Sequence, residues 1–152
     1  MGFLNKMKSA FSKETTEETQ IDTNFTEVII NSIENVPFGI SDTNVMYANE
    51  SELAGFHYFK TIVVGSFRIK TNKGAQLSIK GDGFELKLHS DMVEIESEPS
   101  NIANSYVTHI DFEIEAEDLP KLTKANIQSL ELIAKKECVK FSTIEIRYDE
   151  EE

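Results

Sequence analysis

Residues 61–90, TIVVGSFRIKTNKGAQLSIKGDGFELKLHS, decide the fold that we expect for this chain. Apolar side chains stand at every second position in three short runs, so each run has one apolar and one polar face. Asn72-Lys73-Gly74 and Gly81-Asp82-Gly83 separate the runs and are typical of tight turns. The pattern predicts an antiparallel meander with one buried face and one face in solvent. The residues expected to point inward are Val63, Gly65, Phe67, Ile69, Ala75, Leu77, Ile79, Phe84, Leu86 and Leu88.

Shorter patterns extend the β prediction toward the amino terminus. The β-branched run Val28-Ile29-Ile30 predicts a strand over residues 25–33. Val45 and Tyr47 indicate a second, short strand. Residues 49–56 are expected to form a loop or a single helical turn, because Asn and Ser in this segment are good helix caps.

Toward the carboxyl terminus the alternation shifts by one residue after Ser90 and then continues. Val93 and Ile95 are expected to point inward, and Glu94, Glu96 and Glu98 outward. Residues 106–114 predict another half-buried strand, with Ile110, Phe112 and Ile114 inside.

The segment after residue 116 has two interpretations. One is a single long helix from about residue 118 to residue 137, followed by a strand. The other is a short helix near 117–125, with Pro120 in its first turn, and then a hairpin over 127–147 that turns at Lys135-Lys136-Glu137. The strand-like residues 140–148 need a neighbour, which favours the hairpin.

These elements predict a mainly β fold, a single-domain antiparallel β-barrel or sandwich of about 7–8 strands. The chain of 152 residues is long enough to bury one such core. We expect a β-rich domain over 25–148, preceded by an amphipathic basic helix over 1–13 and an acidic flexible linker over 14–24. An acidic tail over 149–152 follows.

The formal net charge of -12 is unevenly distributed. Residues 1–13 hold three lysines and no acid, and residues 14–59 hold nine acids and no base. Residues 60–89 hold six bases and two acids, whereas residues 90–152 hold six bases and sixteen acids. A chain this acidic repels phosphate at long range, so we expect no nucleic-acid partner.

The expected cellular location follows from the absence of membrane and secretion signals in the sequence. It contains neither an apolar run long enough for a transmembrane helix nor a secretory signal peptide. The single Cys138 has no partner for an internal disulfide. We therefore expect a cytoplasmic protein.

The amino-terminal segment is the first candidate binding element. Its apolar residues recur at helical spacing, and its lysines lie off that face. Basic amphipathic helices of this kind bind grooves on partner proteins or acidic membrane surfaces. The acidic remainder of the chain opposes binding to anionic lipid, so the membrane is the weaker alternative. The candidate partner-binding residues are Phe3, Leu4, Met7, Phe11, Lys6 and Lys8.

The first hypothesis for function is therefore a non-enzymatic cytoplasmic interaction or scaffold module. Its amino-terminal helix docks on a protein partner, on its own domain or on a second copy, which would give a homo-oligomer. The cellular process stays open.

The basic meander is the second candidate. Arg68, Lys70, Lys80 and Lys87 are expected on its outward face, where they could bind a small anionic, nucleotide-like ligand. The alternative is that these cations pair across strands with Glu94, Glu96 and Glu98, which is ordinary sheet stabilisation.

One short motif in this meander resembles a known family. Ser78-Ile79-Lys80-Gly81 is similar to the S-x-x-G part of the PilZ signature, which implies cyclic-dinucleotide binding. The chain departs from that signature at Gln76, where the family has Asp or Asn. Upstream it has only Arg68, where the family has paired arginines.

No catalytic, cofactor-binding or metal-binding residue is predicted. The pairs His89/Asp91 and His109/Asp111 could bind zinc only if two strands brought them together, and the shift after Ser90 works against this. Cys138 is expected to be a buried, unreactive thiol. An unrecognised enzyme stays as the third hypothesis, because catalytic residues can assemble from distant parts of a chain.

Overall fold

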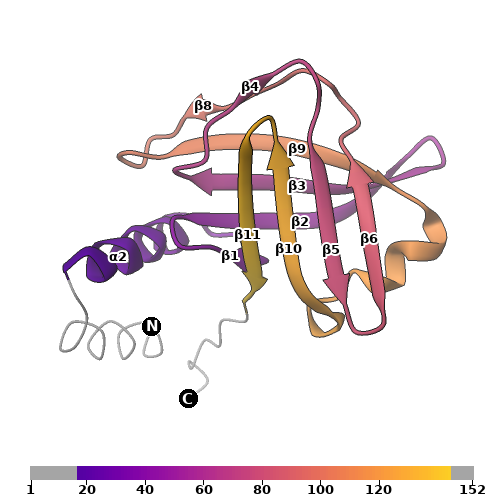
Figure 1. Ribbon diagram of the computed structural model, residues 1–152, viewed down its shortest axis with the longest axis horizontal. Coiled ribbons are helices and arrows are strands. Elements are labelled where there is room, and N and C mark those ends of the chain that lie inside the picture. Colours follow the sequence, from indigo (N-terminus) through magenta and orange to yellow (C-terminus); the bar gives the residue numbers. More distant parts are fainter. Residues whose placement is uncertain (1–16, 145–152) are drawn as a thin grey trace.

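The structure is a computed structural model that describes residues 17–144 (Figure 1). The fold is mainly β, with a large antiparallel sheet that curls into a half-barrel and few helices. The helical elements are α2 (Glu17–Ser32) and two 3₁₀ helices, η1 (Ala116–Lys121) and η2 (Lys124–Asn126). The strands are β1 (Gly39–Ile40), β2 (Asn44–Leu53), β3 (Phe56–Gly65), β4 (Lys70–Thr71), β5 (Gln76–Gly81), β6 (Phe84–His89), β7 (Ile95–Glu96), β8 (Glu98–Pro99), β9 (Tyr106–Ile114), β10 (Ile127–Ala134) and β11 (Glu137–Thr143).

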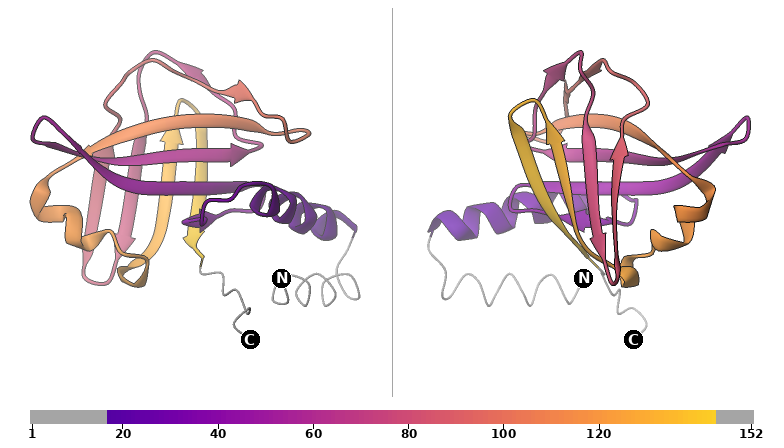
Figure 2. Two further views of the ribbon diagram at one scale, coloured as in Figure 1. Left: turned by 180° about the vertical axis from the view of Figure 1, so that it is seen from behind. Right: turned by 45° about the vertical axis from the view of Figure 1, so that its right-hand side comes forward.

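The main sheet has nine strands in the order β6-β5-β10-β11-β1-β2-β3-β9-β8, and β4 pairs with β7 in a separate ribbon. Strands β5, β6, β10 and β11 cross steeply over β2, β3 and β9, as two views of the molecule show (Figure 2). A bridge between Ser90 and Phe112 links the end of β6 to β9, and the Asp91 N–H donates to the Asp111 carbonyl at 2.8 Å. The sheet therefore curls around its own inner face.

The main core fills the inside of this curl. Leu77 and Ile79 of β5 face Leu130 and Leu132 of β10, and all four side chains are fully buried. Ile110, Phe112 and Ile114 of β9 are buried as well. The alternation predicted for β5 and β9 is therefore confirmed, because the period-2 pattern sends every second side chain inward.

A second, smaller core lies on the outer face of β2 and β3 and is covered by α2. Ile29 and Ile30 of α2 pack with Val45, Tyr47 and Val64. The prediction of a strand over 25–33 is wrong. Positions 26, 29 and 30 are buried and positions 25 and 33 are partly buried, which is a helical spacing, and packing on the sheet outweighs the β preference of a three-residue run. The helix also begins within the expected linker, at Glu17.

The prediction of a loop over 49–56 is also wrong. Strand β2 continues to Leu53 and pairs with β3 along its whole length, from Asn44↔Gly65 to Leu53↔Phe56. Ala54 and Gly55 form the two-residue turn with φ of 55° and 87°. Left-handed values at both positions match the twist of a tight hairpin, for which Asn-Gly is the usual sequence. Because the first turn position is alanine and not asparagine, the sequence pattern did not predict this turn.

The meander prediction holds in part. The β5–β6 hairpin turns at Gly81-Asp82-Gly83 as expected, but β4 pairs with β7 instead of β5. Phe67 and Ile69 are buried as predicted, although they lie outside the strands. The inward position predicted for Val93 is wrong, since this side chain is 58% exposed.

Beyond β9 the hairpin interpretation is confirmed. Strands β10 and β11 pair from Leu130↔Phe141 to Ala134↔Glu137. The helix expected near 117–125 is replaced by η1 and η2, which are 3₁₀ helices that anchor Leu122 in the core.

The hairpin turn of β2 and β3 gives a stability prediction. Ala54→Asn should stabilise the fold by about 1 kcal/mol, because Asn tolerates the left-handed region better than Ala. For a chain of this size the melting temperature should rise by about 2–4 °C, measurable by differential scanning fluorimetry.

Gly55→Ala is the matched control at the next position. A Cβ at Gly55 would meet no atom within 4 Å, so any change reports the backbone conformation alone. It should lower the melting temperature. Equal melting temperatures for the two variants and the unmodified chain would contradict the turn geometry.

Candidate functional site

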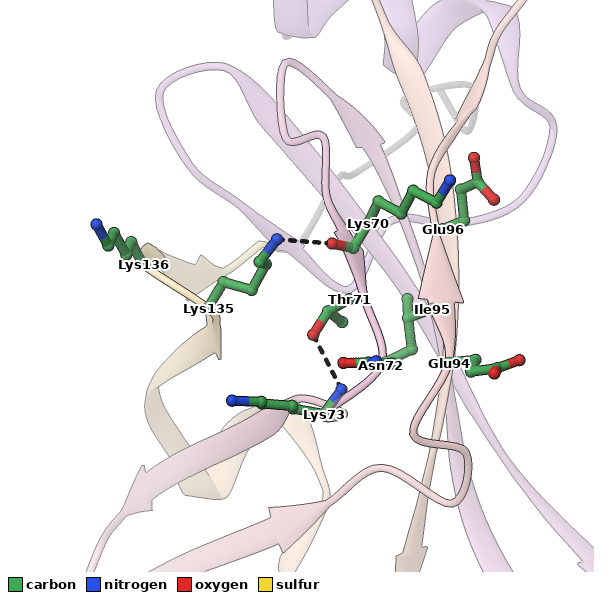
Figure 3. Close-up of a pocket in the computed structure, with 9 residues that line it drawn as sticks. All are labelled: Lys70, Thr71, Asn72, Lys73, Glu94, Ile95, Glu96, Lys135 and Lys136. Atoms are coloured by element: carbon green, nitrogen blue, oxygen red, sulfur yellow. Dashed lines mark hydrogen bonds between the residues drawn. The ribbon is translucent and has the colours of Figure 1, made fainter.

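A cavity of about 900 Å³ opens at one end of the half-barrel, between the β4–β7 ribbon and the β10–β11 turn (Figure 3). Three stretches of chain that are distant in sequence line it. We call this cavity the basic groove, and its lining residues are Lys70, Thr71, Asn72, Lys73, Glu94, Ile95, Glu96, Lys135 and Lys136.

Hydrogen bonds that involve backbone groups hold the two walls of the basic groove in place. The Lys135 ammonium donates to the Lys70 carbonyl at 3.0 Å, which joins the β10–β11 turn to β4 (Figure 3). The Lys73 N–H donates to Thr71 Oγ1 at 3.1 Å, and the Gly74 N–H donates to the Val93 carbonyl at 2.8 Å. These bonds fix the position from which the Lys73 side chain extends.

The charge of the groove is largely uncompensated. Lys70 is the register partner of Glu96, and its side chain is directed toward that carboxylate (Figure 3). Among the side chains described, those of residues 25–144, the one ion pair within 4 Å joins Lys121 to Asp118, on η1. Lys73, Lys135 and Lys136 are not part of that ion pair, so their charges create a positive potential at this end of the half-barrel, although the Lys136 side chain extends away from the other two (Figure 3).

Lys135 adopts a conformation that lysine rarely takes. Its φ is 54°, in the left-handed region, where Gly or Asn is favoured and another residue costs about 1–2 kcal/mol. Backbone strain of this kind is found preferentially at functional sites. At this position lysine supplies an ammonium group to the groove, which Gly or Asn could not do.

A smaller recess of about 400 Å³ adjoins the basic groove and shares Lys70, Lys135 and Lys136 with it. It adds Arg68, whose guanidinium lies over the Tyr106 ring at 4.8 Å and donates to the tyrosine oxygen at 3.3 Å. Five cationic side chains therefore gather at this end of the half-barrel: Arg68, Lys70, Lys73, Lys135 and Lys136.

The four residues predicted for anion binding are divided between two places. Arg68 and Lys70 line the groove and its adjoining recess, whereas Lys80 and Lys87 line neither. Lys80 lies opposite Glu85 on the outer face of β5 and β6, and Lys87 lies opposite Ser78. The alternative of ordinary cross-strand pairing is met in register by Lys70, which lies opposite Glu96, one of the expected glutamates, whereas Lys80 lies opposite Glu85, which was not expected.

Sequence patterns missed Lys135 and Lys136 as site residues. The turn itself was placed correctly, but its contact with β4 joins positions 65 residues apart. A lysine pair at a two-residue hairpin turn, where Asn-Gly is usual, is the one signal that could have pointed to them.

The predicted partner-binding residues Phe3, Leu4, Lys6, Met7, Lys8 and Phe11 lie outside the residues that the structure describes. Their role stays a prediction.

The two histidine–aspartate pairs do not form a metal centre in the described part of the chain. Among the side chains of residues 25–144, the structure contains no group of three or more His, Cys, Asp or Glu residues able to hold a metal ion. Asp91 and Asp111, the acidic members of the two pairs, affect the titration of a neighbouring tyrosine, Tyr58. Partial burial, followed by the charges of Asp91, Glu113 and Asp111, raises the pKa of Tyr58.

Cys138 is exposed, and the expectation of a buried thiol is wrong. Its Sγ donates to Glu131 Oε2 at 2.7 Å on the outer face of β10 and β11. This hydrogen bond raises the pKa of Cys138, with smaller contributions from desolvation and from the Glu131 charge. A higher pKa leaves less thiolate near neutral pH and makes the side chain a poor nucleophile.

The thiol gives a second prediction. Glu131→Ala should lower the pKa of Cys138 and increase the rate of its alkylation by iodoacetamide at pH 8. Glu137→Ala is the control, because Glu137 neighbours Cys138 but is not its hydrogen-bond acceptor. The rates should converge at a pH where every variant is fully thiolate, and equal rates at pH 8 would contradict the assignment.

Among residues 17–144, no helix is long and apolar enough to span a membrane. Comparisons with protein families, with curated proteins and with solved structures give no match to this chain.

Proposed function

We propose that this protein binds a small anionic ligand in the basic groove. The observation that carries the proposal is that Lys70, Lys73, Lys135 and Lys136, which come from separate segments of a chain with net charge -12, line one cavity. Glu94 and Glu96 also line the groove, but a lysine present only for solubility would not need to occupy a left-handed turn position. Here the left-handed conformation of Lys135 and its hydrogen bond to the Lys70 carbonyl place an ammonium group at the groove.

The lining of the groove suits a ligand that has both a charged and an apolar part. Thr71 and Ile95 are largely buried, and both line the cavity beneath the lysines. The volume lies within the range of about 300–1,000 Å³ that is common for small-molecule sites. A phosphate or carboxylate would interact with the lysines, and a ring would contact Ile95. A nucleotide-like ligand fits this description.

The proposal assumes that the expected fold is the barrel and not the sandwich. In support, the Ser90–Phe112 bridge brings β6 to β9, the two strands between which the sheet would have to close. The β4–β7 ribbon would then cover one end of the barrel, which is a frequent position for ligand sites in β-barrels.

The proposal retains the non-enzymatic character that we expected from the sequence. What the groove supplies is positive charge and hydrogen-bond donors, which bind an anion, and the thiol of Cys138 is a poor nucleophile. The interaction-module hypothesis, with its amino-terminal helix, is a separate proposal that involves other residues.

The test is a ligand-induced rise in melting temperature. Pyrophosphate, ATP and citrate are added separately at constant ionic strength. At a ligand concentration one hundred times Kd, binding stabilises a protein by about 2.7 kcal/mol, which for a chain of this size is about 5–10 °C. Lys73→Glu with Lys135→Glu should abolish that rise.

The chain offers a matched control for this double variant. Lys80→Glu with Lys87→Glu makes the same change in net charge on exposed positions outside the groove, and the rise should persist. Lys135→Asn removes the ammonium and its bond to the Lys70 carbonyl while keeping a residue that tolerates the left-handed conformation, so an unchanged melting temperature without ligand would show that weaker binding is not due to unfolding. No rise with any of the three anions, or a loss confined to the Lys80/Lys87 variant, would refute the proposal.

A further inference from the structure

A second groove lies away from the basic one, on the outer face of the sheet beside the carboxyl end of α2. Its volume is about 530 Å³. Its apolar wall comes from the segment after α2 and from β2 and β3, and its polar rim includes a residue of β9. We call it the α2 groove, and the residues that matter here are Ile33, Val36, Tyr47, Ile62, Val64 and Asp111.

The α2 groove continues the second core. Tyr47 and Val64 are buried in that core, and Ile33 and Ile62 pack against it. Helix α2 ends at Ser32 and therefore covers only part of the outer face. Val36 remains 61% exposed. Apolar side chains placed here would extend an existing core, which is a favourable way to bury them.

We propose that residues 1–13 of the same chain occupy the α2 groove. Phe3 and Leu4 would enter the groove, Met7 and Phe11 would continue the same apolar face along α2, and the lysines would lie off that face. This inference is independent of anion binding in the basic groove, because the two cavities share no lining residue.

The length of the preceding chain permits this contact. Helix α2 has 16 residues and begins at Glu17, so its two ends are about 24 Å apart. Residues 1–13 would span about 20 Å as a helix. The three residues before Glu17 add up to about 10 Å when extended. A segment that runs back along α2 can therefore bring Phe3 and Leu4 to the α2 groove.

Charge also favours this occupant. Residues 14–59 hold nine acids and no base, while residues 1–13 hold three lysines and no acid. Glu34 and Glu50 are exposed on the segments that flank the groove, and Asp111 is at its rim. Lys60 and His109 also line the groove and partly offset these carboxylates. The short tether gives the segment a high effective concentration, which favours its own domain over a second copy.

The experiment measures disulfide formation in the full chain, in a Cys138→Ser background. Leu4→Cys is combined with Val36→Cys, and the disulfide is followed by mass spectrometry at low protein concentration. The matched control combines Leu4→Cys with Val93→Cys, because Val93 is 58% exposed but lies next to the basic groove. The 4–36 disulfide should form within one chain, about tenfold or more faster than the 4–93 disulfide.

A further variant distinguishes docking from mere proximity. Met7→Asp with Phe11→Asp should markedly slow the 4–36 disulfide and leave the 4–93 rate unchanged, because the apolar face is lost while the tether is kept. Equal rates for both cysteine pairs, or a 4–36 disulfide that is unaffected by these substitutions, would overturn the proposal. A 4–36 disulfide found only between two chains would also overturn it and would assign the groove to a second copy. None of these outcomes depends on the lysines tested with pyrophosphate.

Discussion

The place where β3 ends determines the rest of this structure. At Gly65, φ is 155°, and a Cβ there would collide with the Thr43 carbonyl and the Asn44 side chain. Only glycine permits this approach. Asn44 Oδ1 then accepts the Phe67 N–H at 2.8 Å, in a site where Asn44 is almost fully buried. The hydrogen bond replaces the strand pairing that Phe67 has lost, so the chain can leave the sheet without an unsatisfied buried donor.

The departure at Gly65 makes the candidate ligand site possible. Because residues 66–69 do not continue β3, β4 crosses the end of the half-barrel and pairs with β7. Phe67 and Ile69 secure this crossing in the core, and Ser97 fixes it by accepting the Ile69 N–H through Oγ at 2.9 Å. Lys70 and Lys73 are thereby carried to the β10–β11 turn, which a continuous meander would have kept apart from them.

Sequence reasoning succeeded where one physical pattern dominated. Leu77 and Ile79, or Ile110 and Phe112, alternate with polar residues in strands that have one face in solvent, and their burial follows directly from period 2. It failed at residues 25–33, where a β-branched run was read without its helical spacing. It also failed at Ala54, an unusual residue for its turn. The basic groove could be anticipated only in part, through Arg68 and Lys70. The contact of Lys135 with β4 depends on tertiary structure, which local sequence patterns do not report.

The acidic character of the chain does not oppose an anion site of this kind. At physiological ionic strength the screening length is about 8 Å, so a ligand in the groove responds mainly to the charges that line it. Those are four lysines and two glutamates, Glu94 and Glu96. Lys70 is directed toward Glu96, which leaves three ammonium groups against one carboxylate, Glu94. The distant acids still reduce the rate of encounter with any anion, and Glu94 disfavours anions that approach its side of the groove. Local attraction combined with long-range repulsion would favour a ligand whose charge is concentrated at one end, such as a terminal phosphate.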